Sequence, residues 1–393
     1  MSTQVVVVGS GYAGAGAVKA FEDEVGEGEA DLTWISEHDY HLVLHEVHRA
    51  IRNPAVAEKI TIPVDEIKSP ESNFVRGRVV DVDTNEQVVE TDDGTTVDYD
   101  YLLLGVGSTT AFFGIEGLEE NAHQLKSLAD AKAIHEDVRS AAAEATRSDP
   151  VEVIVGGAGL SGIQTAGEIA EYRDKHRAPV DIKLVEGLDE VFPGNDPQLQ
   201  GALRQRLEDA DIEILTGDFI SKADGDAVYL GGGEDEEPEE LPYDVLVWTG
   251  GITGQPELEN VEVEKDERSN RVHAGSDFTT SDDRVFAIGD TALVEQGDDD
   301  VAPPTAQAAW QAAEVGGENL ARAARGAPLQ SWEHTDKGTV ISVGEDAVAH
   351  DVMGMPIKTF GGTPAKLLKK SIAARWIAKV SSAGRAASAF GDM

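Results

Sequence analysis

The chain of 393 residues has no cysteine, few basic residues and no long apolar run, and each absence excludes a class of protein. Without a thiol it cannot run a dithiol relay, a sulfide oxidation through cysteine–sulfur intermediates or a cysteine-sulfenate peroxidase cycle. No apolar stretch approaches the ~20 residues that cross a bilayer. A strand expected within the first five residues leaves no room for an export signal. We expect a protein made in the cytosol, soluble or peripheral to a membrane.

The charge balance is strongly acidic. Asp and Glu number 74 against 32 Lys and Arg, which gives a formal net charge of −42. Such a surface excludes unaided nucleic-acid binding, because phosphate neutralisation needs bases. The acid excess is typical of a salt-adapted cytosol, where a Debye length of only about 3 Å at molar salt screens the self-repulsion. We expect loss of structure in low salt.

A glycine fingerprint follows the first apolar run. Val5 to Val8 leads into residues 9–14, Gly-Ser-Gly-Tyr-Ala-Gly, then a helix is expected to about Glu24, and a second strand ends at Ser36 and Glu37. The first Gly permits a tight turn, the second lets a pyrophosphate approach, and the third packs helix on strand. The helix N-terminus holds phosphate charge, and the terminal acid binds ribose hydroxyls. The pattern predicts a dinucleotide site.

The same pattern returns at residues 151–186. A strand at 151–155 precedes Gly157, Gly159 and Gly162, a helix is expected through about His176, and the strand at 180–185 ends at Glu186. One copy is weak support for a nucleotide site, but two copies in register predict two dinucleotides. The pairing favours a flavin and a nicotinamide working in series.

Three more segments are expected to return the chain to the first site. Strands at 99–104 and 284–290 end at Gly105, Gly107 and Asp290, and two prolines and Thr305 open a helix over 306–325. The positive N-terminus of that helix would stabilise the charge on N1 and O2 of a reduced flavin. An ordinary capped core helix is the alternative. Strands are also expected at 74–82 and 87–91, around a turn.

The predicted fold is α/β, with two Rossmann-like dinucleotide-binding domains and a small C-terminal β/α region. We expect an FAD domain at 1–115 and 270–330, an inserted NADH domain at 116–269, and the C-terminal region at 331–393. His45-Glu46-Val47-His48 spaces its histidines three apart, without the zinc-protease spacing or an evident third ligand, so no metal site is expected.

These motifs resemble the two-dinucleotide flavoproteins and, within them, the type II NADH:quinone oxidoreductases. Residues 247–251, Val-Trp-Thr-Gly-Gly, resemble that family's WTAG motif, and residues 286–290 resemble its second flavin motif, in which the Asp binds the ribityl chain. Residues 306–311, Ala-Gln-Ala-Ala-Trp-Gln, match its AQxAxQ quinone motif at every fixed position. The similarity covers nearly the whole chain.

The fingerprints and the resemblance together imply the site residues. Gln307 and Gln311 would border the quinone headgroup, and Val79 falls where the family contacts adenine. The flavin contacts would be Gly9, Gly11, Tyr12, Ala13, Gly14, Ser36, Glu37, Val79, Gly105, Gly107, Asp290, Thr305, Ala306 and Gln307; the NADH contacts would be Gly157, Gly159, Leu160, Gly162, Glu186, Gly250 and Gly251.

Two positions depart from the family pattern. Gln164 stands where the family usually has a Glu close to the meeting point of nicotinamide and flavin, and Gln cannot ionise. A proton-relay role for that catalytic position is thereby in doubt, although the next family acid is kept as Glu168. Ser36 stands where many relatives have Asp, which favours Glu37 as the ribose ligand.

The resemblance implies an FAD enzyme that takes hydride from NADH and passes two electrons to a membrane quinone without pumping protons. Glu186, with no Arg behind it, favours NADH over NADPH. Two alternatives stay open: an NADH-dependent reductase of a small electron-carrier protein, and a low-turnover flavin-binding redox sensor, suggested by Gln164. The native quinone is left undefined, and a homodimer is left open.

The C-terminal segment reverses the charge of the chain. Between Val352 and Gly391 there is no acid but seven bases. At 366–380 the residues Leu368, Ile372, Trp376 and Val380 recur at i, i+4 spacing, which predicts a basic amphipathic helix with an interfacial Trp. We expect this helix to bind the inner face of the cell membrane; a helix packed on the body, with its bases paired to the acidic surface, is the alternative.

Overall fold

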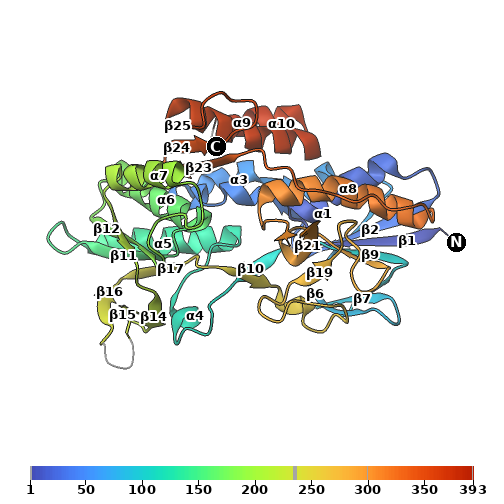
Figure 1. Cartoon of the computed structure of the whole chain (residues 1–393), viewed down its shortest axis with the longest axis horizontal. Helices are drawn as coiled ribbons and strands as arrows, with labels where there is room; N and C mark the ends of the chain where they lie inside the picture. Colours follow the sequence, from blue (N-terminus) through green and yellow to red (C-terminus); the bar gives the residue numbers. More distant parts are fainter. Residues whose placement is uncertain (1, 233–236, 299, 392) are drawn as a thin grey trace.

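Two parallel sheets organise the molecule, one in each lobe of the computed structural model, which describes residues 2–232, 237–298, 300–391 and 393. In Figure 1 the first lobe combines early and late parts of the chain, and the second lobe holds the middle. The first sheet has the order β20 (Val285–Ala287), β9 (Tyr101–Leu104), β1 (Thr3–Val8), β2 (Ala30–Ser36), β5 (Asn73–Arg76); the second has β13 (Ile212–Thr216), β12 (Val180–Glu186), β11 (Val151–Gly156), β17 (Val245–Trp248).

Every strand pair in these two sheets is parallel, which confirms the predicted α/β class. The continuous apolar runs at 5–8, 102–104 and 153–155 are buried on both faces, as parallel strands covered by helices require. The helices are α1 (Tyr12–Glu24), α2 (Arg49–Arg52), α3 (Ala57–Ile60), α4 (Leu118–Asn121), α5 (Leu128–Glu144), α6 (Leu160–His176), α7 (Pro197–Asp209), α8 (Ala306–Ala324), α9 (Thr363–Val380) and α10 (Ala383–Phe390).

Small sheets surround the two parallel ones, and their strands pair antiparallel except for the parallel pair of β19 and β21. The predicted strand at 74–82 is in fact two strands, because the extended strand is interrupted at Gly77. β5 joins the first parallel sheet, and β6 pairs with β7. The minor sheets are β6 (Val79–Asp83), β7 (Val88–Thr91), β8 (Thr96–Asp98); β14 (Ile220–Ala223), β15 (Ala227–Leu230), β16 (Glu239–Pro242); β19 (Val272–Ala274), β21 (Ala292–Gly297), β22 (Asp300–Val301); β3 (Tyr40–Leu42), β4 (Thr61–Pro63); and β23 (Thr339–Val343), β24 (Asp346–His350), β25 (Thr359–Gly361).

The chain crosses between the lobes at a two-stranded ribbon. β10 (Ser108–Thr110) leaves the first lobe and pairs antiparallel with the returning β18 (Ile252–Gly254). The short 3₁₀ turn η4 (Pro256–Leu258) then packs beside β6, with an ion pair between Arg78 and Glu257. The segment at 255–258, which the sequence interpretation gave to the second domain, therefore packs on the first.

Helices α1 and α8 lie against each other in the first lobe (Figure 1). The contact is made through small residues. A Cβ on Gly317 would come within 2.3 Å of the carbonyl oxygen of Ala17, and one on Gly16 within 2.7 Å of Ala313. Larger side chains would separate the two helices, so these glycines set where the N-terminus of α8 lies relative to β1 and α1.

The C-terminal region spans both lobes rather than standing apart (Figure 1). Helix α9 forms as predicted, but most of its apolar stripe does not face outward. Trp376, Ile377 and Val380 are buried in the body, and Trp376 packs on Tyr12 and Trp310. The interfacial-Trp prediction is therefore wrong. Within the described residues, no helix is both long and apolar enough to cross a bilayer.

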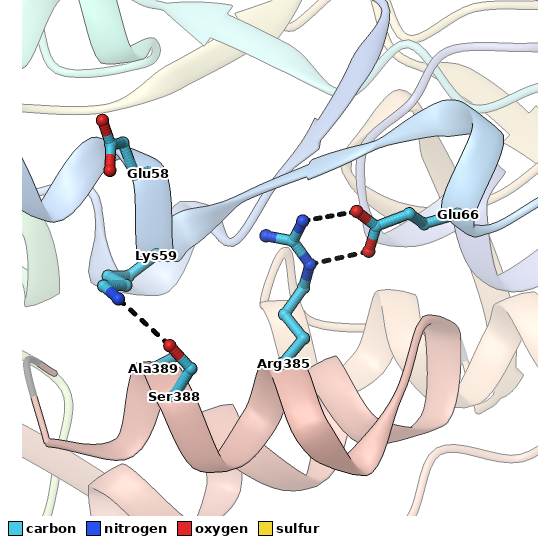
Figure 2. A pocket seen from close by; sticks show the side chains of 6 residues that line it. All are labelled: Glu58, Lys59, Glu66, Arg385, Ser388 and Ala389. Carbon is cyan, nitrogen blue, oxygen red and sulfur yellow. Dashed lines mark hydrogen bonds and ion pairs between the residues drawn. The ribbon is translucent and has the colours of Figure 1, made fainter.

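The bases of this region pair with acids of the body. Lys379 lies 3.0 Å from Glu314 and Lys358 lies 2.7 Å from Asp196, whereas Lys366 pairs with Glu345 inside the C-terminal region itself. Figure 2 shows the same at α10, where Arg385 meets both oxygens of Glu66 and the Lys59 ammonium donates to the Ser388 hydroxyl. The alternative prediction, a packed helix paired with the acidic surface, is the one that the structure supports here.

Candidate functional site

The first fingerprint has the geometry that its three glycines predict. A Cβ on Gly9 or Gly14 would collide with backbone, 2.3 Å from the oxygen of Gly105 and 1.9 Å from the oxygen of Gly9. A Cβ on Gly11 would meet nothing within 4 Å. The outer glycines are thus required by packing, and the middle one leaves open space at the start of α1, where no side chain caps the helix. The chain fits a pyrophosphate at this place.

The late motif of the first lobe is held against that turn. Gly289, with φ +70°, lies between Ala13 of α1 and Ala309 of α8, since a Cβ there would meet theirs at 3.2 and 3.4 Å. The next residue, Asp290, accepts a 3.3 Å bond from the Ser108 hydroxyl. Gly107 donates its N–H to Thr291 at 2.8 Å. Gly105 and Gly107 of one segment and Asp290 of another therefore meet beside the first fingerprint.

The N-terminus of α8 points into the same region. The Thr305 hydroxyl caps the helix by accepting a 3.1 Å hydrogen bond from the N–H of Ala308, so α8 begins at Ala306. With Gly289 tying this helix to α1, the positive end of α8 stands beside the first dinucleotide turn.

The remaining predicted flavin residues divide by exposure. Ser36 is buried and donates to the Ser10 hydroxyl at 2.8 Å, whereas Glu37 is exposed, which leaves Glu37 as the carboxylate accessible to a ribose. Val79 is buried at the start of β6. The Tyr12 side chain turns inward and hydrogen bonds to His45, so only the backbone of Tyr12 is available at the turn.

The second fingerprint repeats the first. A Cβ on Gly162 would come within 1.8 Å of the oxygen of Gly157, and a Cβ on Gly159 would meet nothing within 4 Å. Gly250 lies directly against this turn, because a Cβ on Gly157 would be 2.8 Å from its Cα, and Thr249 donates to the Gly157 carbonyl at 2.9 Å. Gly251 follows with its Cα beside the exposed ring of Phe113.

Glu186 is held more firmly than its counterpart in the first half. Its Oε2 accepts the N–H of Ala158 at 2.8 Å, and its Oε1 accepts the N–H of Leu188 at 3.0 Å. Each oxygen keeps a further lone pair, so the carboxylate can accept ribose hydroxyls in a fixed orientation.

Gln164 joins the second half to the C-terminal region. Its amide nitrogen donates to the hydroxyl of Ser342 on β23 at 3.3 Å, and the buried Lys369 of α9 donates to the same hydroxyl at 2.9 Å. Lys369 also lies 3.8 Å from Glu46. The position that departs from the family pattern is therefore joined to a buried lysine through one shared hydroxyl.

A buried ionic cluster surrounds that lysine at the junction of both lobes and the C-terminal region. Arg49 pairs with Glu46, and Arg52 lies 3.0 Å from Glu168 of α6. Burial lowers the pKa of Lys369 to about 8, although the carboxylate of Glu46 opposes this. Burial raises the pKa of Glu46, but Lys369 and Arg49 outweigh it and hold that pKa below its usual range.

One acid and two histidines of this region have pKa values that burial dominates. Burial raises the pKa of Glu168 more than Arg52 and Arg49 lower it. It lowers the pKa of His45 to about 4 and that of His48 well below its usual range. His45 hydrogen bonds to Tyr12, and His48 to Ser342 at 3.1 Å, so both rings lie in this network as neutral imidazoles.

Gln307 and Gln311 lie on the first turns of α8. Their side chains hydrogen bond to the backbone of one segment, residues 335–338. The Gln307 Oε1 accepts the N–H of Lys337 at 2.6 Å. The Gln311 amide both donates to and accepts from the backbone of Thr335, at 2.9 and 3.1 Å. The structure thus brings the two glutamines together with a C-terminal segment that the motif itself does not contain.

The comparisons with known proteins agree with this geometry. Residues 3–313 match the family described as Pyridine nucleotide-disulphide oxidoreductase. The chain belongs to that family. It has no cysteine for a disulfide, so the membership rests on its nucleotide-binding halves.

Individual relatives extend the likeness over the whole chain. A type II NADH:quinone oxidoreductase of Staphylococcus aureus is 29% identical over 401 aligned residues, which cover 98% of this chain and 97% of the relative. The structure of NDH2 from Plasmodium falciparum in complex with NADH has a TM-score of 0.84 at 15% identity, covering 100% and 98%. The sulfide:quinone oxidoreductase of Aquifex aeolicus has 0.79 at 18%, covering 96% and 91%. The two structures share the fold.

Sequence reasoning missed Glu46, Arg49, Ser342 and Lys369 as parts of the site. They come from three segments, and no spacing within any one of them indicates the others. In the sequence, His45-Glu46-Val47-His48 stands out only as a histidine pattern that lacks the spacing of a metal site. One local signal is present. Lys369 falls on the apolar side of the predicted helix at 366–380, where a charged side chain needs a buried partner.

Proposed function

We propose that the protein is a type II NADH:quinone oxidoreductase that holds FAD and does not pump protons. The supporting observations are two nucleotide turns of the same geometry, the α8 N-terminus beside the first of them, and the bonds of Gln307 and Gln311 to one C-terminal segment. The full-length likeness to the Staphylococcus aureus enzyme supports the same proposal. The absence of cysteine argues against a sulfide-oxidising role for a fold shared with sulfide:quinone oxidoreductase.

The residues of the first half would hold the flavin. The backbone at Gly11 to Gly14 would bind the pyrophosphate, Glu37 the adenosine ribose, Val79 the adenine and Asp290 the ribityl chain. The start of α8, at Thr305 and Ala306, would stabilise negative charge on the ring. Bound FAD supplies the chemistry of two-electron transfer between a hydride donor and a quinone.

The residues of the second half would bind NADH. Gly157, Gly159, Leu160 and Gly162 would cradle its pyrophosphate, Glu186 its ribose, and Gly250 and Gly251 would let the nicotinamide end approach closely. Gln164 would orient that end by hydrogen bonding and cannot itself take a proton. The nearest ionisable neighbour through Ser342 is Lys369.

Gln307 and Gln311 would border the quinone. Their amides fix the segment at 335–338, so the two residues both shape the acceptor site and hold its wall. Gln311→Leu should raise the KM for a quinone analogue by about tenfold, the value of about 1.4 kcal/mol of lost polar contacts, and leave anaerobic flavin reduction by NADH unchanged. Gln205→Leu, exposed on α7, is the matched control.

Anaerobic mixing tests the proposal as a whole. NADH should bleach the flavin rapidly, and a quinone analogue should restore it. Restoration only by a small electron-carrier protein would replace this proposal with a carrier reductase, and absence of bleaching would replace it with a redox sensor.

We further propose that the enzyme rests on the inner face of the cell membrane through a surface that shares only Ile372 with the stripe first predicted. Met353, Met355 and Ile357 of the loop before β25, and Leu367 and Ile372 of α9, are large apolar side chains exposed to solvent. The N–H of Met353 donates to the carbonyl of Lys337 at 3.2 Å, so this loop adjoins the segment that Gln307 holds. A lipid-soluble quinone would reach the glutamines from this side.

Vesicle flotation in high salt tests this surface. Each fully buried apolar side chain gives roughly 1.5–3 kcal/mol, while salt screens the bases. Met353→Asp with Ile357→Asp should release the enzyme from anionic vesicles without loss of activity toward a water-soluble quinone, whereas Leu188→Asp should not release it. Equal release by Lys370→Gln with Arg375→Gln would contradict apolar docking.

A further inference from the structure

Three large apolar side chains are exposed along one edge of the second parallel sheet. Leu160 follows β11, Leu188 follows β12 and Phe219 follows β13, with exposed fractions of 37%, 49% and 64%. These strands are neighbours in the sheet, and the carboxyl ends of parallel strands lie at the same edge. Ligands of open α/β sheets bind at that edge, so side chains that avoid the core here are candidates for ligand contact.

The ring of Phe219 lies directly on Gly187. A Cβ on Gly187 would come within 2.2 Å of the Phe219 ring, so any larger residue at 187 would displace it. One side of the ring is thus supported by backbone while most of the side chain stays in solvent. A buried role for Phe219 is excluded by its exposure.

The backbone around Phe219 is fixed. The N–H of Gly217 donates to the carbonyls of Glu186 and Leu188, at 3.0 and 3.1 Å, and the Phe219 carbonyl accepts the N–H of Gly231 at 2.8 Å. These bonds tie the loop after β13 to the turn after β12. The exposed ring is therefore presented by an ordered loop beside the anchored carboxylate of Glu186.

We propose that Phe219, flanked by Leu188, is the platform on which the adenine ring of NADH stacks. The inference rests on the proposed NADH site, because a ribose held by Glu186 carries its adenine to the surface next to Gly187. Stacking of a base on an aromatic ring is sequence-tolerant and depends on area and π-contact. The residue would set affinity for the adenosine half and have no part in hydride transfer.

ADP-ribose isolates this contact, since it carries the adenine, both riboses and the pyrophosphate but no nicotinamide. Calorimetric titration of the flavin-loaded enzyme in high salt should give a Kd about tenfold weaker for Phe219→Ala, the equivalent of about 1.4 kcal/mol of stacking. Phe219→Leu should fall between, Phe219→Tyr should match the original protein, and Leu367→Ala, similarly exposed on α9, should have no effect.

Kinetics with two hydride donors complete the test. Phe219→Ala should raise the KM for NADH about tenfold at unchanged kcat. It should leave turnover with reduced nicotinamide mononucleotide unaltered, because that donor has no adenine. Unchanged ADP-ribose binding by Phe219→Ala, or equal losses with both donors, would overturn the proposal. Failure of NADH to reduce the flavin of the unmodified protein would instead contradict the proposed function.

Discussion

The two dinucleotide halves share one fingerprint but differ in what surrounds it. In the first half the turn lies under the start of α8 and the Asp290 segment, and Tyr12 packs beneath Trp376 of the C-terminal region. In the second half the carboxyl edge of the sheet exposes Leu160, Leu188 and Phe219. An enclosed turn suits a cofactor that stays bound, and an open edge suits a substrate that must enter and leave at every turnover.

The terminal acids differ in the same direction. Glu186 is oriented by two backbone N–H groups, while Glu37 is exposed and the buried Ser36 binds the turn instead. A substrate site gains from a preorganised carboxylate, because each binding event must otherwise fix it anew. A resident cofactor is held by enclosure, so its ribose ligand needs less restraint.

The middle glycines should separate the two halves most clearly. A Cβ on Gly11 or Gly159 meets nothing in the protein, so alanine there should leave thermal stability within about 0.5 kcal/mol and obstruct only the ligand. Gly11→Ala should purify without flavin. Gly159→Ala should keep its flavin, but the affinity for NADH that drives anaerobic flavin reduction should fall at least tenfold. This corresponds to a steric cost of about 1.4 kcal/mol or more. Flavin content, melting and anaerobic reduction measure these effects; identical behaviour of the two variants would remove the distinction between the halves.

Trp376→Ala should open the enclosed half. Its side chain is fully buried against Tyr12, His41 and Trp310, and truncation of such a residue costs about 3–5 kcal/mol. The free energy of unfolding in urea at high salt should fall by that amount, and flavin should dissociate on dilution. Ile372→Ala on the exposed side of α9 is the control and should change little. A Trp376 variant with unaltered stability would restore the membrane-facing assignment of this side chain.

Coenzyme choice should depend on the acid of the second half, Glu186, and not on Glu37. Removing its charge and adding a cation, as in Glu186→Ser with Leu188→Arg, should move the NADPH/NADH preference roughly ten- to a hundredfold, the equivalent of 1.5–3 kcal/mol. Gly187 is a poor place for the added Arg, because its side chain would collide with Phe219. The corresponding Glu37→Ser should weaken FAD retention and leave the preference unmoved. A fixed preference in the first variant would show that Glu186 is not at the ribose.

A further expected effect concerns the pH dependence of stability at the junction of the halves. Burial places the pKa of Lys369 at about 8 against an ordinary 10.5, so between these values the unfolded chain binds a proton that the folded protein has released. The contribution of this group to stability therefore rises with pH across that window, by up to about 1.4 kcal/mol per unit. Urea unfolding in high salt should show a shallower pH slope for Lys369→Met than for the original protein. Lys379→Met should keep the original slope; a Lys369→Met slope equal to the original would place Lys369 in a solvated environment.

The sequence predicted the features that are local in the chain. Both fingerprints, the terminal acid Glu186 and the helix that begins after Thr305 depend on spacing within a few residues, and the structure has them where they were expected. The positions of Gly105, Gly107 and Asp290 also followed, because strand ends of one parallel sheet meet at one edge.

The features missed depend on contacts between distant segments. The i, i+4 stripe at 366–380 is the same whether a helix faces lipid or protein, and only the contact of Trp376 with Tyr12 decides it. The role of Lys369 depends on its contacts with Glu46 and Ser342. The role of Phe219 depends on its contact with Gly187 at the neighbouring strand end. The spacing of residues within a single segment does not predict any of these contacts.

The central claim, that one half retains its dinucleotide while the other exchanges it and electrons pass between them, is tested most directly by one anaerobic stopped-flow measurement. The protein is purified and gel-filtered in high salt, then mixed with a single equivalent of NADH while the flavin absorbance is followed. The account predicts one flavin retained per chain, complete bleaching by that equivalent, and NAD⁺ recovered in the filtrate afterwards. Flavin lost on gel filtration, or a retained flavin that NADH leaves oxidised, would contradict it.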